Sequence, residues 1–492
     1  MVSRAIDRSP STGRTVLARP ASARAHAALA GVGLALAALS AAVWWTVTVR
    51  DGGPVHVLVG TGLCCAAAGC AWLLLRSAER RGASERWVIA AVVLGLLAAG
   101  AAALAAPPLT SNDSARYAWD GIVQKAGISP YRDVPAADAL AGLRPGWLFA
   151  GPGAASADAC VAAFPTGGVP TTSVPSGTPL CTAINRPHVP TAYPPVAEAF
   201  FALVRLPLPP GVAWLAFQIA GLGLALAVAL VVVRALRREG RPPSWAALWA
   251  WNPLVLLEAV NNAHVDVLSA ALLLGAGLLG AGVPGAGLPS ARRAASSGAF
   301  FGLAVATKLI PAVALPGMLR NRPWRFGAAA LAAFVAAYVP YVAVSGPAVI
   351  GYLPGYLSEE GYASGDKSRF ALPGILLPPF AALVVGLAAV LAVWVWVWAR
   401  RHVLEPMTAQ ALAVGWTLLI VCPSYAWYAL MLVPLAVLGR RPELLVVPLA
   451  LEAVTATVGT DAGAPVARVA MAAAALVVLG VGLTRARSAR PR

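Results

Sequence analysis

The sequence predicts an all-α, polytopic integral membrane protein. Of its 492 residues, 59% are hydrophobic and only 12% are charged, and the mean hydropathy is +0.74. Soluble domains carry about 25% charged residues. Many uncharged runs are long enough to cross roughly 30 Å of hydrocarbon as helices, which satisfy their backbone hydrogen bonds internally. The length of the chain therefore goes into membrane spans rather than into several soluble domains.

Apolar runs bounded by charge, proline or glycine predict about twelve transmembrane helices. Their ranges are 26–48, 54–75, 87–106, 212–233, 244–260, 264–283, 324–345, 372–399, 406–421, 424–438, 443–459 and 464–484. Two further segments do not fit complete spans: 194–209 is short and bounded by prolines, and Lys308 and Pro311 interrupt 296–319. We predict half-helices or re-entrant hairpins for both, because such segments are tolerated where they line a cavity within the protein.

The net charge of +17 comes from short basic blocks between the apolar runs. These blocks are 4–24, 76–86, 234–241, 320–325, 400–401, 440–441 and 485–492. The pattern is typical of the positive-inside rule. It argues against a nucleic-acid partner, because a phosphate-binding surface would not be divided between membrane spans.

We therefore expect a plasma-membrane protein with cytoplasmic tails at 1–25 and 485–492 and a membrane domain over 26–484. Its large outer loops would be 107–193 and 346–371, which hold many of the 20 acidic residues. Short basic cytoplasmic loops explain where the arginines lie. They do not explain why acids also enter the ends of spans, where a charge is costly.

The stretch SNDSARYAWDGIVQKAGISPY at 111–131 directly follows an apolar run. A helix over 114–126 would carry two carboxylates, a guanidinium and a phenol on one face, from Asp113, Asp120, Arg116 and Tyr117. Such a face suits substrate binding. An amphipathic helix at the membrane interface, with Tyr117 and Trp119 as belt residues, explains the same spacing. The spacing alone leaves both interpretations open.

A second polar group lies at a predicted helix–turn–helix junction within 251–270. Its members are Asn252, Glu258, Asn261, Asn262, His264 and Asp266. One asparagine could simply cap the next helix. Capping does not require the carboxylates and the histidine as well, so we predict that at least one of these residues contacts a ligand.

Cations and aromatic residues mark three more candidate positions. Lys308 lies inside an apolar segment, so we expect an anionic partner, either a lipid phosphate or an acid such as Glu452. The loop 346–371 contributes Lys367 and Arg369, although it could be an ordinary solvated loop. The predicted hairpin 422–430 presents Tyr425 and Tyr428, which interfacial anchoring would also explain.

The six cysteines form no pattern typical of a metal site. Cys160 and Cys181 lie in the same predicted outer loop. In an oxidising compartment they could close a ring of roughly 20 residues as a disulfide, and the sequence leaves open whether they do.

The motif D-x-x-R-Y-x-W-D-G, completed by G-x-x-P-Y, over 113–131 resembles the first outer loop of the GT-C membrane glycosyltransferases. It looks most like the actinobacterial polyprenyl-phosphomannose-dependent α-1,6-mannosyltransferases of the lipomannan type. Further similar pieces lie in order along the chain at 191–203, 251–266, 302–316 and 423–435. One departure is Ser129, where the family pattern has asparagine before Pro-Tyr.

The resemblance implies a GT-C-like fold and an inverting transfer of mannose from a polyprenyl-phosphate donor to a glycan or glycolipid acceptor, among membrane lipids. Asp113 would be the base and Asp120 would orient the sugar. Phosphate would meet Arg116, Lys308, Lys367 and Arg369. The remaining substrate-binding candidates are Tyr117, Trp119, Tyr131, Tyr193, Asn261, Asn262, His264, Asp266, Tyr425 and Tyr428. No metal ligands are evident, although a divalent metal is not excluded.

Two alternatives remain open at this point. Another GT-C enzyme could use a different lipid-linked sugar, because pocket shape decides which sugar is accepted. A transporter or flippase of lipid-linked sugars would explain the broken segments and Lys308. Transporters often contain internal repeats, however, and none is evident in this sequence.

Overall fold

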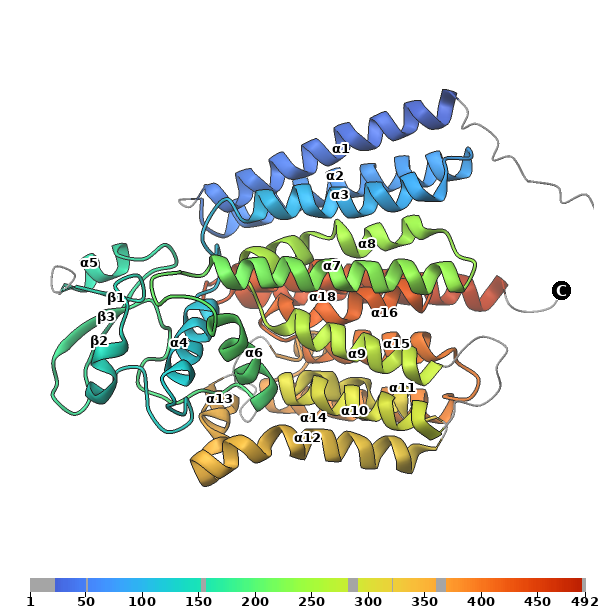
Figure 1. Cartoon of the computed structure of the whole chain (residues 1–492). Coiled ribbons are helices and arrows are strands. Elements are labelled where there is room, and N and C mark those ends of the chain that lie inside the picture. The colour runs from blue at the N-terminus through green and yellow to red at the C-terminus, as the bar shows by residue number, and fades with distance from the viewer. Residues whose placement is uncertain are drawn as a thin grey trace, which may run out of the picture.

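Long apolar helices run side by side through most of the molecule, and the segment 107–193 covers one end of them (Figure 1). The computed structural model describes residues 23–49, 52–151, 156–281, 291–320, 322–359 and 369–488. The long helices are α1 (Ala23–Thr48), α2 (Gly53–Arg80), α3 (Glu85–Ala103), α7 (Leu215–Arg238), α9 (Asp266–Ala281), α10 (Ala291–Thr307), α12 (Pro323–Ser345), α14 (Pro379–Ala399), α15 (Pro406–Val421) and α18 (Gly463–Ser488). The predicted all-α polytopic fold is confirmed. Lys367 and most of the N-terminal tail lie outside the described residues.

Seven helical segments of the described chain are long and apolar enough to cross a membrane. An eighth is added if Val255–Asn261 and Asp266–Ala281, which meet at 113°, count as one span. The four other predicted spans are present as shorter or interrupted helices. One of them, α15, is a single short helix with the predicted bounds 406–421. The other three are interrupted: α8 (Ala247–Ala250) is followed by the π-helix Val255–Asn261, α16 (Leu432–Leu438) follows Ala426–Met431, and α17 (Val446–Thr457) follows Pro442–Leu445. Uncharged length alone did not reveal these interruptions.

Of the two segments predicted as partial spans, the first is a short helix and the second turns back. Residues 195–205 form the 11-residue helix α6 (Pro195–Arg205). After α10, the chain turns at Lys308 and returns through Ile310–Ala314 and α11 (Leu315–Met318). Ser297 near the start of this hairpin and Met318 at its end line the same small cavity. The hairpin therefore begins and ends at the same end of the bundle.

The basic blocks that fall within the described residues gather at the end of the bundle opposite the 107–193 segment, which we call the basic end. Arg241 donates to the carbonyls of Val437 and Leu438. Arg320 donates to the carbonyl of Leu404, and Arg485 donates to that of Arg440. The covered end, which we call the loop end, holds most of the predicted site residues. This separation agrees with the positive-inside pattern.

The loop end contains the only strands of the described residues. They are β1 (Phe149–Ala150), β2 (Val169–Thr172) and β3 (Pro179–Thr182), which form an antiparallel sheet in the order β1-β3-β2. Sequence analysis did not predict this small sheet. Cys160, in α5 (Ala157–Ala162), forms a disulfide with Cys181 of β3. The helix α4 (Asp113–Lys125) closely matches the helix expected over 114–126.

Two glycines one helical turn apart let α10 and α12 approach closely. A Cβ on Gly298 would lie 2.1 Å from the carbonyl oxygen of Phe326, and one on Gly302 would lie 2.1 Å from that of Ala330. This is the small-residue spacing that brings backbones together where lipid provides no hydrophobic drive. It matters for α12, because only Phe326 and Ser345 are buried along that helix.

We expect Gly302→Ala to push α12 away from α10, because the added methyl group would meet backbone rather than a movable side chain. The substitution should lower the free energy of unfolding by about 1–3 kcal/mol, seen as a lower midpoint of thermal unfolding in detergent. Gly327→Ala in α12 is the matched control, since its Cβ would meet nothing within 4 Å. Equal midpoints for the two variants would contradict this packing.

Candidate functional site

A cavity of about 510 Å³ at the loop end brings together residues from five separate parts of the chain. We call it the Asp113 pocket. Of the predicted site residues, it is lined by Asp113, Arg116, Tyr193, Lys308, Tyr425 and Tyr428. The pocket is also lined by Tyr352 and Tyr356 from the predicted outer loop 346–371, and by Asn185 and Arg186, which were not predicted as site residues. Their positions follow from the path of the two loops, which no local pattern revealed.

Asp113 begins α4, and three neighbouring groups hold its side chain. Its Oδ1 accepts a hydrogen bond from Asn185 Nδ2 at 3.2 Å, and its Oδ2 accepts one from the Tyr193 hydroxyl at 3.0 Å. Nδ1 of His264 lies 3.7 Å from the same Oδ2. The carboxylate also benefits from the positive end of the helix dipole. The Asp113 side chain remains 18% exposed, so it is fixed and still reachable from the pocket.

His264 is completely buried beside Asp113. Its Nε2 lies 3.2 Å from Glu258 Oε2, so the imidazole sits between two carboxylates. The ring stacks on Trp427 at 3.7 Å between centroids, and Trp427 stacks on Tyr425 at 4.5 Å. This stack of three rings fixes the plane of the imidazole. A ring fixed in this way keeps Nδ1 of His264 directed at the Asp113 carboxylate.

Asn261 and Asn262 hold the chain that leads to Asp113. Asn261 donates to the carbonyls of Ala103 and Ala106 at the end of α3. The side-chain oxygens of both asparagines accept from the backbone N–H of Leu109 at 2.9 Å. Both asparagines are buried and lie behind the pocket wall. The structure thus places them as supports for the approach to Asp113, not among the pocket-lining residues.

Asp120 is buried beneath the pocket and forms an ion pair with Arg116. Nε of Arg116 donates to both carboxylate oxygens of Asp120 at 2.9 Å. Glu198 of α6 lies against this pair and accepts from Thr191 Oγ1 at 2.6 Å and from Gln124 Nε2 at 2.8 Å. Burial, and then the charge of Asp120, raises the pKa of Glu198 well above its ordinary value. The protonated form of Glu198 is therefore favoured beside the Arg116–Asp120 ion pair.

Glu198 was missed as a site-supporting residue, although a visible signal existed: a single acid inside the short apolar stretch 194–209. Asp120 does not line the Asp113 pocket. Its position suits holding Arg116, whose Nη1 also donates to the carbonyl of Val189 at 3.1 Å. Arg116 itself reaches the pocket wall.

The aromatic residues of α4 are interior, not interfacial. Tyr117 is 0% exposed and stacks on Phe201, while Trp119 is 1% exposed and packs against Phe149. The alternative that Tyr117 and Trp119 are belt residues in contact with lipid is therefore wrong. Tyr131 is also buried and donates to the carbonyl of Tyr193 at 2.7 Å, which helps to hold the tyrosine that contacts Asp113.

Lys308 projects into the pocket from the tip of the 291–318 hairpin. Its Nζ lies 2.7 Å from Asp266 Oδ2 and 4.9 Å from the centroid of the Tyr428 ring. The expectation that Glu452 could be its acidic partner is wrong, because α9 begins with Asp266 at this point and supplies the carboxylate. An ammonium group has three donors, so the ion pair leaves Lys308 able to bind an anion.

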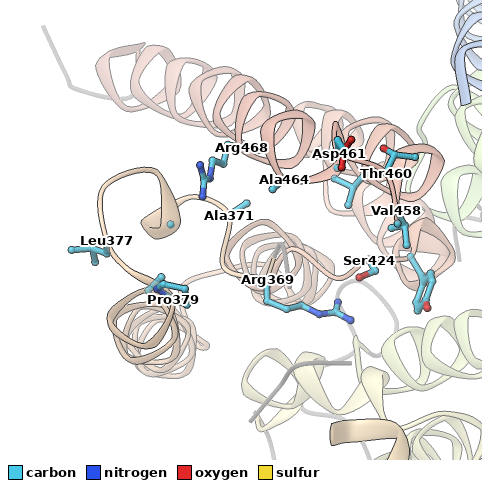
Figure 2. Close-up of a pocket in the computed structure, with 16 residues that line it drawn as sticks. Arg369, Ala371, Leu377, Pro379, Ser424, Val458, Thr460, Asp461, Ala464 and Arg468 are labelled. Carbon is cyan, nitrogen blue, oxygen red and sulfur yellow. The ribbon is translucent and has the colours of Figure 1, made fainter. Parts of the chain in front are cut away.

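Arg369 lies outside the Asp113 pocket. It lines a second cavity of about 440 Å³ between α14, α17 and α18, which we call the Arg369 pocket (Figure 2). Tyr425 lines both cavities. The described residues contain no group of three or more His, Cys, Asp or Glu side chains that could hold a metal ion.

Comparison with known families identifies one region of similarity. Residues 191–423 match the model of Glycosyltransferase family 87. The matched region includes Tyr193, His264, Asp266 and Lys308, and it begins after the 113–131 motif. No curated protein and no solved structure matches the chain. The match supports the general class of membrane glycosyltransferases.

Because the pKa of Glu198 is raised, the folded chain holds a proton that the unfolded chain loses above about pH 4.5. The folded state then binds more protons, so stability should fall as pH rises above that value, by up to about 1.4 kcal/mol per pH unit. We expect Glu198→Gln to flatten this part of the curve. Thermal midpoints measured between pH 4 and 9 test this, with exposed Glu405→Gln as control. Parallel curves for wild type and Glu198→Gln would contradict the raised pKa of Glu198.

Proposed function

We propose that this membrane glycosyltransferase moves a mannosyl residue from a polyprenyl-phosphate donor to a lipid-linked glycan acceptor at the outer face of the cell membrane. The observation that carries the proposal is the Asp113 pocket. There, a fixed and partly exposed carboxylate shares one cavity with two cationic side chains, Arg116 and Lys308. The mannose donor and the glycan acceptor come from the resemblance of 113–131 to the lipomannan-type enzymes.

The transfer is a direct displacement at the anomeric carbon. The acceptor hydroxyl gives its proton to Asp113 as its oxygen forms the new glycosidic bond. The bond between the anomeric carbon and the donor phosphate oxygen breaks, and the phosphate leaves with the electron pair. Attack from the opposite face inverts the anomeric configuration, which turns a β-linked donor into an α-linked product. General-base catalysis of this kind contributes typically 10²–10⁴-fold.

The departing phosphate needs positive charge rather than a proton. Lys308 is 15% exposed on the cavity wall, and Arg116 is fixed by its bond to Asp120. Groups that are already held in place cost no reorganisation when charge develops. Arg186, which also lines the cavity, pairs with Glu359 at 2.8 Å and thereby joins the two loops across it.

One wall of the Asp113 pocket suits a prenyl chain. Its aliphatic side chains are Leu309, Ile310, Val313, Leu418 and Val421. They come from the returning hairpin and from α15, so the apolar wall adjoins the cation at position 308. A lipid phosphate could therefore meet Lys308 while its first isoprene units contact these residues.

The outer location rests on charge distribution. The basic blocks of the described residues lie at the basic end, while Asp113 and its pocket lie at the loop end of the same bundle. Under the positive-inside rule the basic end faces the cytoplasm. The reaction would then use a donor delivered at the outer leaflet.

We expect Asp113→Asn to reduce mannosyl transfer by at least about 100-fold, because the amide keeps the shape but cannot accept the proton. The assay uses membranes supplied with labelled polyprenyl-phosphomannose and measures labelled glycan at equal protein levels. Asp158→Asn, on the exposed part of the same loop, is the control. Wild-type transfer by Asp113→Asn would remove Asp113 as the base. Movement of the label across vesicles without any glycan product would favour a flippase.

Lys308→Met should lower kcat by about 10²-fold, because it removes a fixed positive charge beside the leaving phosphate. Lys308→Arg should restore part of the rate, since it keeps the charge with altered geometry. Single-turnover transfer in detergent measures both effects. Lys125→Met is the matched control, because Lys125 is exposed and donates to the carbonyl of Leu208 away from the pocket. An equal rate for wild type and Lys308→Met would exclude a role in phosphate departure.

A further inference from the structure

The Arg369 pocket lies at the loop end and is not used by the proposed transfer reaction. Its polar lining includes Arg369 from the chain before α14, Arg468 from α18, Asp461 and the hydroxyl groups of Ser424 and Thr460. In Figure 2 the Arg468 side chain extends from α18 toward the segment around Ala371, and Arg369 points toward Ser424. Among the described lining residues, two guanidinium groups and one carboxylate give a net positive charge.

Arg468 is an unusual residue for its position. It lies five residues into α18, one of the seven candidate spans, which places it about 7–8 Å along the helix from Gly463. A charge within a span is costly and usually serves a purpose. Within the described part of the chain, Arg468 forms no hydrogen bond or ion pair. Asp461 lines the same cavity but does not form an ion pair with Arg468.

The rim of the same cavity carries apolar side chains on its outer surface. Gly374, Leu377 and Pro379 line the cavity, while their neighbours Ile375, Leu376 and Phe380 are 48%, 89% and 71% exposed. In a membrane-spanning chain, such a surface beside the start of α14 suits contact with acyl chains. The cavity therefore has a cationic interior next to a lipid-compatible edge.

We propose that the Arg369 pocket binds the phosphate group of an anionic membrane lipid. Arg468 and Arg369 are the cations, because guanidinium groups pair with phosphate oxygens through two parallel hydrogen bonds. The acyl chains lie over the apolar rim at 375–380. Asp461 disfavours a second anionic group, so one lipid occupies the site. This site is separate from the one that holds the reacting sugar and does not rest on the proposed transfer reaction.

The test is a binding titration of the full chain, purified and delipidated in a neutral detergent. Phosphatidylglycerol, phosphatidylcholine and inorganic phosphate are added in separate series, and native mass spectrometry measures the fraction of protein that retains one lipid. We expect phosphatidylglycerol to bind at least about tenfold more tightly than phosphatidylcholine. Arg468→Gln should weaken phosphatidylglycerol binding roughly tenfold, as expected when one charge-assisted contact is lost, and leave phosphatidylcholine binding unchanged.

Arg132→Gln is the matched control, because Arg132 is an exposed arginine at the loop end that does not line the cavity. Arg369→Gln should act like Arg468→Gln. Because Arg369 is buried and its loss could disturb folding, the exposed Arg468 carries the decisive comparison. Equal binding of the two lipids, or an unchanged affinity in Arg468→Gln, would overturn the proposal. Displacement of phosphatidylglycerol by millimolar inorganic phosphate would also overturn it, since the pocket would then recognise the free anion and not a lipid.

Discussion

The buried ion pair between Arg116 and Asp120 is the constraint on which the loop end depends. Both side chains are almost inaccessible, and Glu198 packs against them from α6. A buried pair of this kind adds little net stability, but breaking it by removing one partner is costly, because the other charge is left alone. Gln124 of α4 donates to Glu198 of α6, so a hydrogen bond joins the two helices directly beside the pair. Arg116 also donates to the carbonyls of Arg186 and Val189, which ties the start of α4, where Asp113 lies, to the loop before α6.

A second set of contacts fixes the other side of Asp113. The amides of Asn261 and Asn262 bind the backbone between α3 and α4, and His264 follows them by two residues. The same short turn thus holds the approach to the carboxylate and supplies its imidazole neighbour. Trp427 closes the far face of that ring. The pocket is accordingly defined by tertiary contacts among segments more than 150 residues apart, not by any one loop.

The sequence predicted the membrane class, the helix at 114–126 and the turning segments, because each leaves a local signal of composition, spacing or proline. It could not predict that Tyr117 and Trp119 are interior, since an amphipathic face looks alike whether protein or membrane covers it. Glu452 was named only as one example of an acidic partner for Lys308, whereas the observed partner is Asp266. Choosing between two acids requires the three-dimensional path of α9, α10 and α17. The role of Glu198 was not predicted, because it depends on the nearby charge of Asp120, which lies 78 residues earlier in the sequence.

The hairpin over 291–318 has a consequence for counting membrane crossings. It rises from the basic end to place Lys308 at the pocket and then returns, so it enters the bundle without changing the side on which the following chain lies. An apolar segment of this kind appears as a peak in a hydropathy profile, but the chain before it and the chain after it lie on the same side of the membrane. Any orientation assigned by numbering apolar peaks would be reversed for every residue beyond position 320 if this segment were counted as one crossing. Basic residues on both of its flanks are the trace that this return leaves in the sequence.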